Sequence, residues 1–143
     1  MKKIFIAGPW RQKKYQLILE HIRKILEEIG YKTFVGAKDV DNYGKIRMSR
    51  HLFWKRIVNE IKNSDVLIVD MKNVGTGFGR VIEVGIAKAF NKKVILLYPS
   101  KFKTDECLEE VADKIISYKN LDDLQKKLKI IKIYAEVYEA IFR

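Results

Sequence analysis

Hydrophobic and polar positions along the chain predict an alternation of strands and helices. Short β-rich apolar runs predict strands at 3–7, 31–35, 66–69, 93–98 and 115–118. Apolar residues at helical spacing predict helices at 15–29, at 51–63, after the glycines near 79, and from 120 or 121 towards 143. A shorter helix is expected from Thr104 or Asp105. Strands that alternate with helices predict a parallel sheet with right-handed crossovers and helices on both faces.

The apolar stripes predict which side of each helix faces the sheet. In the first helix the stripe is Leu17, Ile18, Ile22, Ile25, Leu26 and Ile29. In the second it is Leu52, Phe53, Ile57, Val58 and Ile61. The helix after the glycines has Ile82, Ile86, Ala89 and Phe90. The last helix has Leu121, Leu124, Leu128, Ile131, Tyr134 and Val137. Residues 36–50 have no clear period, and their Asp, Asn and Gly residues predict a loop.

One carboxylate, Glu83, occupies a special place in this pattern. It follows a glycine-rich segment, 73–79, that connects a buried strand to a helix, and its neighbours Val81, Ile82 and Val84 are apolar. Glycines allow the backbone to approach a small ligand closely. Glu83 is therefore either a solvated acid that the helix dipole favours or a functional group.

Three segments are expected to meet at the carboxyl ends of the strands, where open parallel sheets bind ligands. They are the loop 8–13 after the first strand, the segment 36–44 after the second, and the glycine segment with Glu83. Arg11 precedes a helix and suits a phosphate or carboxylate, or is a solvated loop cation. Trp10 either stacks on a base or fills a hydrophobic edge.

Composition narrows the class of protein. The chain has 143 residues, 48% of them hydrophobic and 33% charged, which fits one domain spanning 1–143. No run is long enough to span a membrane, and the apolar run that ends at Pro9 is too short for a signal peptide. A single cysteine, Cys107, and two scattered histidines, His21 and His51, predict a cytoplasmic protein without a metal site. No cofactor is expected.

The net charge of the chain indicates which kinds of ligand suit it. The net charge of +11 suits nucleic acid or an anionic small molecule. The lysines are spread along helices instead of being clustered with aromatic residues on one strand face. This distribution disfavours nucleic-acid binding as the main function.

Several motifs together resemble the nucleoside 2-deoxyribosyltransferase superfamily. They are KIFIAGP, SDVLIVDM, the glycine segment and IEVGIAKAFNKKVILLYP, over a region from Lys3 to about Leu128. Within the superfamily the sequence is most similar to the 2′-deoxynucleoside 5′-phosphate N-hydrolases. The resemblance implies a three-layer α/β/α fold of the flavodoxin or Rossmann-like type, with a five-stranded parallel sheet in the order 2-1-3-4-5. It also implies homodimers or larger homo-oligomers, with sites near a subunit interface.

The resemblance also assigns roles to residues. It implies that Glu83 is the nucleophile that cleaves the N-glycosidic bond of a (deoxy)nucleoside 5′-monophosphate, either releasing the base or transferring the sugar to another base. The 5′-phosphate would bind the N–H groups of residues 77–80 and the loop around Arg11. The implied substrate-binding residues are Gly8, Pro9, Trp10, Arg11, Thr76, Gly77, Gly79 and Arg80.

Two positions depart from the family pattern. Phe5 stands where the family has a tyrosine, and Ile57 stands where it has an aspartate that contacts sugar or base. Asp39, Asp41 or Tyr43 is a candidate replacement. The two departures leave open a second function, a nucleotide-binding module without turnover, in which Glu83 only binds a ribose. A phosphoribohydrolase of the cytokinin-activating kind ranks lower, because its Pro-Gly-Gly entry is absent.

Overall fold

A five-stranded parallel sheet forms the centre of the protein. The computed structural model describes the backbone of residues 2–72, 78–100 and 106–142, and their side chains apart from 106 and 133–142. The strands are β1 (Lys3–Ala7), β2 (Lys32–Val35), β3 (Val66–Asp70), β4 (Lys93–Pro99) and β5 (Lys114–Tyr118). The helices are α1 (Lys13–Ile29), α2 (Gly36–Asp41), α3 (Arg50–Lys62), α4 (Gly79–Ala89), α5 (Glu106–Val111) and α6 (Leu121–Phe142).

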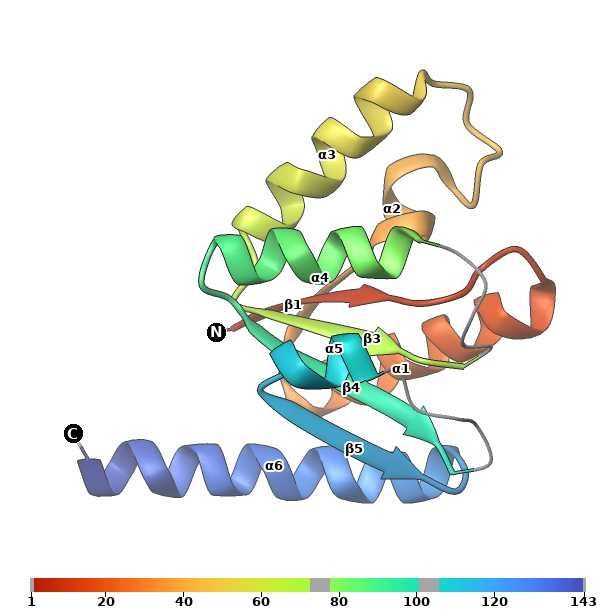
Figure 1. The fold of residues 1–143 in the computed structure, drawn as a ribbon. Coiled ribbons are helices and arrows are strands. Elements are labelled where there is room, and N and C mark those ends of the chain that lie inside the picture. The colour runs from red at the N-terminus through yellow and green to blue at the C-terminus, as the bar shows by residue number, and fades with distance from the viewer. Residues whose placement is uncertain (1, 73–77, 101–105, 143) are drawn as a thin grey trace.

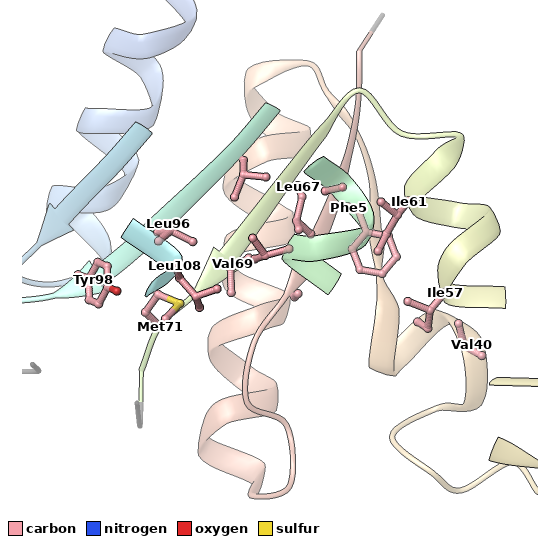
Figure 2. Close-up of a cluster of buried hydrophobic side chains, with 14 of the residues drawn as sticks. Phe5, Val40, Ile57, Ile61, Leu67, Val69, Met71, Leu96, Tyr98 and Leu108 are labelled. Atoms are coloured by element: carbon pink, nitrogen blue, oxygen red, sulfur yellow. The ribbon is translucent and has the colours of Figure 1, made fainter. Parts of the chain in front are cut away.

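The strand order is β2-β1-β3-β4-β5, and every neighbouring pair is parallel, which confirms the predicted topology. Helices cover both faces of the sheet, so the fold has three layers (Figure 1). One buried cluster joins the sheet to α1 and α6, and a second joins it to α2, α3, α4 and α5. Figure 2 shows residues of the second cluster, with Phe5 of β1 on the side of the sheet that faces Ile57 and Ile61 of α3. The three central strands, β1, β3 and β4, are nearly continuous apolar runs because both of their faces are covered.

The buried faces of the first two long helices differ from the predicted stripes by one residue each. Leu17 is 59% exposed, whereas Leu19 is 1% exposed and packs with Ile22 in the core. Leu52 is also exposed, while its neighbour Phe53 is buried. Successive helical residues are about 100° apart, so an apolar residue next to the stripe points towards solvent even though its side chain suits the core.

The predicted stripe of α4 is right for Ile86, which packs against the core, and wrong for Ile82 and Phe90. Ile82 is 48% exposed and Phe90 is 37% exposed, whereas Arg80, Val84 and Ala87 form the buried face. A run with apolar residues on nearly every side has no unique stripe, and packing on β3 and β4 selects the face. The consequence is an exposed apolar surface on α4, extended by Phe78, which is 84% exposed.

The loop predicted for residues 36–50 is confirmed only for 42–49, which contain no helix or strand. Residues 36–41 form α2, and Asp39 ties this helix to its surroundings. Its carboxylate accepts the N–H of Val35 at 3.0 Å and pairs with Arg23 of α1. A helix this short shows no period in the sequence, so only its tertiary contacts stabilise it.

The last helix begins where the sequence predicted and packs on α1 and β5. Leu124 and Leu128 are buried, and Leu121 and Ile131 pack against the same cluster. The predicted contributions of Tyr134 and Val137 fall on side chains outside the described part of the structure. In the described part of the chain, no helix combines the length and the hydropathy needed to cross a bilayer.

Candidate functional site

A cavity of about 570 Å³ opens at the carboxyl end of β1. Its walls come from the loop after β1, the start of α1, one side of α3 and the first turns of α4. Figure 1 shows why these parts meet: α4 begins at the end of the sheet towards which the arrows of β1 and β3 point. The polar and aromatic residues that line it are Trp10, Arg11, Gln12, Tyr15, Arg50, Phe53, Trp54, Phe78, Arg80 and Glu83.

The sheet topology explains the position of the cavity. β1 lies between β2 and β3, and Ala7 at the end of β1 is paired with Val69 near the end of β3. The connection after β1 leads to β2 on one side of β1, whereas the connection after β3 leads to β4 on the other side. The loops that follow β1 and β3 therefore run in opposite directions and leave a crevice between them, which is the usual ligand site of such sheets.

Glu83 lies in this cavity, in the second turn of α4. A Cβ atom at Gly79 would be 3.7 Å from its Oε1 and 3.9 Å from Cη2 of Trp54, so the carboxylate and the indole both approach this glycine. The residue is partly exposed. Burial of the carboxyl group raises the pKa of Glu83 to about 8, and the charge of Arg80 offsets part of the rise. Glu83 is the sole acidic residue among those that line the described cavity.

Arg80 was predicted to bind substrate, and the structure gives it a further contact. Its side chain is buried, and Nη1 donates to the backbone carbonyls of Asp70 at 3.2 Å and Lys72 at 3.0 Å. The guanidinium thus joins the end of β3 to the first turn of α4, across the glycine segment. Its edge also lines the cavity, three residues before Glu83. This contact fixes the start of the helix that carries Glu83.

A buried acid, Asp70, lies behind the cavity wall. The hydroxyl of Tyr118 donates to its Oδ1 at 3.0 Å, which connects the ends of β3 and β5. Burial raises the pKa of Asp70 to about 6, although the hydrogen bond from Tyr118 acts in the opposite direction. A Cβ atom at Gly8 would lie 3.0 Å from Cβ of Asp70 and 2.9 Å from Cδ2 of Leu19, so a larger residue at this turn would force both neighbours to shift.

The loop after β1 contributes the residues that the sequence pointed to. Gly8, Pro9, Trp10 and Arg11 all line the cavity, as do Gly79, Arg80 and Glu83 from α4. The cation of Arg11 lies over the Trp10 ring, 5.3 Å from its centroid. The remaining two predicted substrate-binding residues, Thr76 and Gly77, lie outside the described residues.

The aromatic wall on α3 was missed from the sequence. Arg50, Phe53 and Trp54 line the cavity, with the Arg50 guanidinium 4.0 Å from the centroid of the Phe53 ring. Phe53 and Trp54 meet edge to face with their centroids 5.7 Å apart. Two adjacent aromatic residues on a helix point in directions about 100° apart, and here Phe53 is buried while Trp54 is partly exposed. A pair of adjacent aromatic residues is the signal that could have drawn attention to this side of the helix.

The two departures from the family pattern differ in the structure. Phe5 is buried in the core against Phe34, with ring centroids 5.6 Å apart, and it is not among the residues that line the cavity. Ile57 does line the cavity, so an apolar side chain stands where the resemblance implied a carboxylate.

The proposed replacements for these polar groups are wrong. Asp39, Asp41 and Tyr43 are not cavity residues. Asp39 is engaged with Arg23, and Tyr43 donates to Glu20. Asp41 accepts the N–H of Gly44 at 3.0 Å and pairs with Arg50 at 3.4 Å.

Comparison with known proteins places the chain in context. The family model described as nucleoside 2-deoxyribosyltransferase matches residues 4–117. No curated protein sequence matches significantly.

Several solved structures are similar to this chain. The CMP N-glycosidase BcmB of Clostridium botulinum is 26% identical, with a TM-score of 0.65 over 89% of this chain and 98% of that chain. A 2-deoxyribosyltransferase of Bacillus psychrosaccharolyticus is 15% identical, with a TM-score of 0.70 over 86% of this chain and 90% of that chain. The solution structure of BlsM is 20% identical, with a TM-score of 0.64 over 90% and 87% of the two chains. At these identities the last two are evidence for the fold alone.

Proposed function

Since the chain belongs to the nucleoside 2-deoxyribosyltransferase family, we propose that it cleaves the N-glycosidic bond of a nucleoside 5′-monophosphate, with Glu83 as the nucleophile. The family supports N-glycosidase or deoxyribosyltransferase chemistry in general. The observation that carries the specific proposal is the position of Glu83 in the cavity, beside Gly79 and Trp54. The 26% identity with the Clostridium botulinum CMP N-glycosidase supports a nucleotide as the substrate.

The reaction needs one carboxylate beneath the anomeric carbon. An oxygen of ionised Glu83 attacks C1′, the bond from C1′ to the base nitrogen breaks, and the electron pair leaves with the base, which takes up a proton. This step produces a glycosyl ester of Glu83. Water then attacks C1′ and restores the carboxylate, which gives the free sugar 5-phosphate. A second base in place of water gives transfer.

The cavity walls supply binding groups for the two ends of a nucleotide. Arg11 and the N-terminal turn of α4 provide positive charge and N–H groups for the 5′-phosphate. Trp10, Phe53 and Trp54 provide aromatic surface for a base. A nucleoside without a phosphate would leave the positive wall unused, and binding would be weaker.

Protonation of the leaving base is the step with the least support from side chains. Glycosidases commonly use a second carboxyl group as the acid. Among the described cavity residues, Glu83 has no second acid beside it, and Ile57 is apolar. We infer that the base takes its proton from water, and that bases which leave readily are the preferred substrates.

A panel of nucleotides tests the proposal. The protein is incubated with the ribo- and deoxyribonucleoside 5′-monophosphates of all common bases, with the matching nucleosides as controls, and free base is measured by chromatography. We expect release of base from at least one monophosphate, at a rate at least about tenfold above that of its nucleoside, because a charge-assisted phosphate contact contributes roughly 1.5–3 kcal/mol. Equal rates with the nucleosides would contradict the role of the phosphate.

A nucleotide-binding module without turnover is the second candidate. The apolar Ile57 in the cavity and the buried Phe5, which lacks a hydroxyl, favour it. Calorimetry distinguishes the two: tight binding of a monophosphate with no base released over hours would support the module and contradict the enzyme.

We also propose that the protein forms a homo-oligomer through α4. Val81 and Ile82 are exposed on the side of this helix that faces away from the sheet, and Phe78, the N-cap residue, is exposed and also lines the cavity. Exposed apolar residues that are grouped in this way indicate a contact surface. Ile82→Asp should shift the mass in light scattering to that of a monomer, whereas Leu17→Asp, on α1, should not. A monomeric wild type would contradict this proposal.

A further inference from the structure

Three successive residues after α2 have left-handed backbone conformations. They are Asn42 (φ 51°), Tyr43 (φ 57°) and Gly44 (φ 82°). Glycine adopts this conformation freely and asparagine tolerates it, but a bulky residue such as tyrosine is rarely found there. Asn42 is the C-cap of α2, and its N–H binds the carbonyl of Lys38. The N–H of Tyr43 completes the cap on the carbonyl of Ala37 at 2.8 Å, so a tyrosine ends this helix in a conformation that its side chain disfavours.

The effect of this backbone is to place the Tyr43 ring on Trp10. The two rings are stacked, with centroids 6.4 Å apart and an interplanar angle of 25°. The Tyr43 hydroxyl donates to Oε1 of Glu20 on α1 at 3.2 Å. The side-chain amide of Gln16, one turn earlier on α1, donates to the carbonyl of Trp10 at 2.9 Å. Trp10 is thus held both at its ring and at its backbone.

Each ring of the stack also has a cation near it, so two cations and two rings form one row of contacts. The guanidinium carbon of Arg11 lies 5.3 Å from the Trp10 centroid, and Nζ of Lys38 lies 5.6 Å from the Tyr43 centroid. Trp10 and Arg11 line the cavity, whereas Tyr43 and Lys38 do not. The row therefore connects a supporting layer outside the cavity to two residues of its wall.

The supporting layer is itself anchored. Asp39 of α2 pairs with Arg23 of α1 and accepts the N–H of Val35 at 3.0 Å. Arg23 lies 4.0 Å from Glu20, the acceptor of the Tyr43 hydroxyl. These contacts connect α2 to α1 and to the end of β2, so the turn that carries Tyr43 has little freedom to move away from Trp10.

We propose that Tyr43 is a positioning residue of the nucleotide site: it fixes the ring of Trp10, and through it the guanidinium of Arg11, at the cavity wall. This inference rests on the proposed function, because it assigns these two residues to nucleotide binding. Glu83 is carried by a different element, α4. Loss of Tyr43 therefore weakens substrate binding and leaves the bond-breaking step nearly unchanged.

The first experiment examines the position of Trp10 without any substrate. The protein has two tryptophans, Trp10 and Trp54, so 5-fluorotryptophan labelling gives two ¹⁹F signals, which Trp54→Phe assigns. Tyr43→Gly removes the ring and also relieves the backbone, so the fold should be kept. Asn42→Gly is the matched control, because it relieves the neighbouring residue and keeps the stack. We expect the Trp10 signal to move and sharpen in Tyr43→Gly, and to stay in place in Asn42→Gly and Tyr43→Phe. An unchanged signal in Tyr43→Gly overturns the proposal.

The second experiment examines binding and turnover in the same variants, with the monophosphate cleaved fastest in the panel. An aromatic stack contributes up to roughly 1.5 kcal/mol, so KM should rise by about tenfold in Tyr43→Gly, with kcat within about twofold. Tyr43→Phe should restore KM, because the ring suffices. A fall in kcat with KM unchanged overturns the assignment to binding.

If no monophosphate is cleaved, the proposed function fails, and the inference is then decided by two measurements. They are the ¹⁹F signals and a titration of tryptophan fluorescence with cytidine 5′-monophosphate. Weaker binding in Tyr43→Gly than in Asn42→Gly supports the positioning role. Equal binding in the two variants, or no binding to the wild type, overturns it.

Discussion

Replacement of Glu83 by glutamine should lower the rate of base release by at least about 1000-fold, because an amide cannot form the glycosyl ester and cannot stabilise positive charge at C1′. The substitution keeps the size of the side chain, and Glu83 is only partly buried, so the fold should persist. The measurement is single-turnover release of base at saturating protein. Mass spectrometry of the acid-quenched wild type should show a fraction of protein heavier by one sugar phosphate, and this fraction should be absent from the variant.

The matched control is Glu28→Gln, an exposed glutamate near the end of α1, far along the chain from the cavity residues of that helix. Its rate should equal that of the wild type. A Glu83→Gln variant that keeps more than a tenth of the rate would remove this carboxylate from the mechanism.

The pH dependence of the wild-type reaction provides a second measurement on the same group. The nucleophile must be ionised, and the pKa of Glu83 is raised to about 8. The value of kcat/KM should therefore rise tenfold per pH unit below pH 8 and level off above it. A rate that is flat from pH 5 to 9 would contradict a buried nucleophile, whereas a second, falling limb at high pH would report an acid that protonates the base.

Replacement of Asp70 by asparagine should increase stability at pH 8 relative to the wild type, and the gain should disappear near pH 4. The folded state raises the pKa of this buried acid from 3.8 to about 6, so it holds the proton more tightly than the unfolded chain. Stability therefore falls as the pH rises from about 4 to 6, and ionisation of Asp70 costs about 3 kcal/mol above that range. Asparagine does not ionise, and its oxygen still accepts the hydroxyl of Tyr118.

Urea denaturation at a series of pH values measures this effect. The difference in free energy of unfolding between Asp70→Asn and the wild type should be about 3 kcal/mol larger at pH 8 than near pH 4. Any constant cost of the amide group cancels in this comparison. The control is Asp122→Asn, which removes an exposed acid in the first turn of α6. A constant difference for Asp70→Asn would mean that this carboxyl is not held protonated by burial.

The helix α4 shows what the hydrophobic pattern could predict and what it could not. Its location, its approximate bounds and its role as the carrier of Glu83 were all predicted, but its buried face was not. With Val81, Ile82, Val84 and Ile86 in one short run, several orientations bury similar apolar area. The hydrogen bonds of the buried Arg80 side chain to the carbonyls of Asp70 and Lys72 hold the helix in the observed orientation. A long-range contact of this kind has no local signature.

The residues of the cavity also divide into those that the sequence predicted and those that it missed. The loop 8–11 and Glu83 were predicted because turns and strand ends have recognisable local sequences. Arg50 and Trp54 were missed because they lie within a helix whose apolar residues appeared to belong to the core. They reach the cavity only because α3 packs against α4 with that side of the helix towards the strand ends.

Local order of residues was thus sufficient for the number and order of the strands, for every helix except α2, and for the parallel sheet. These properties follow from short-range spacing along the chain, whereas the family and its candidate nucleophile came from the resemblance of several motifs. Packing alone decided which side of each helix is buried, that residues 36–41 are helical, that Asp70 is a buried acid, and that Tyr43 supports Trp10. Each of these depends on groups far apart in sequence, whose burial and contacts exist only once the layers have come together.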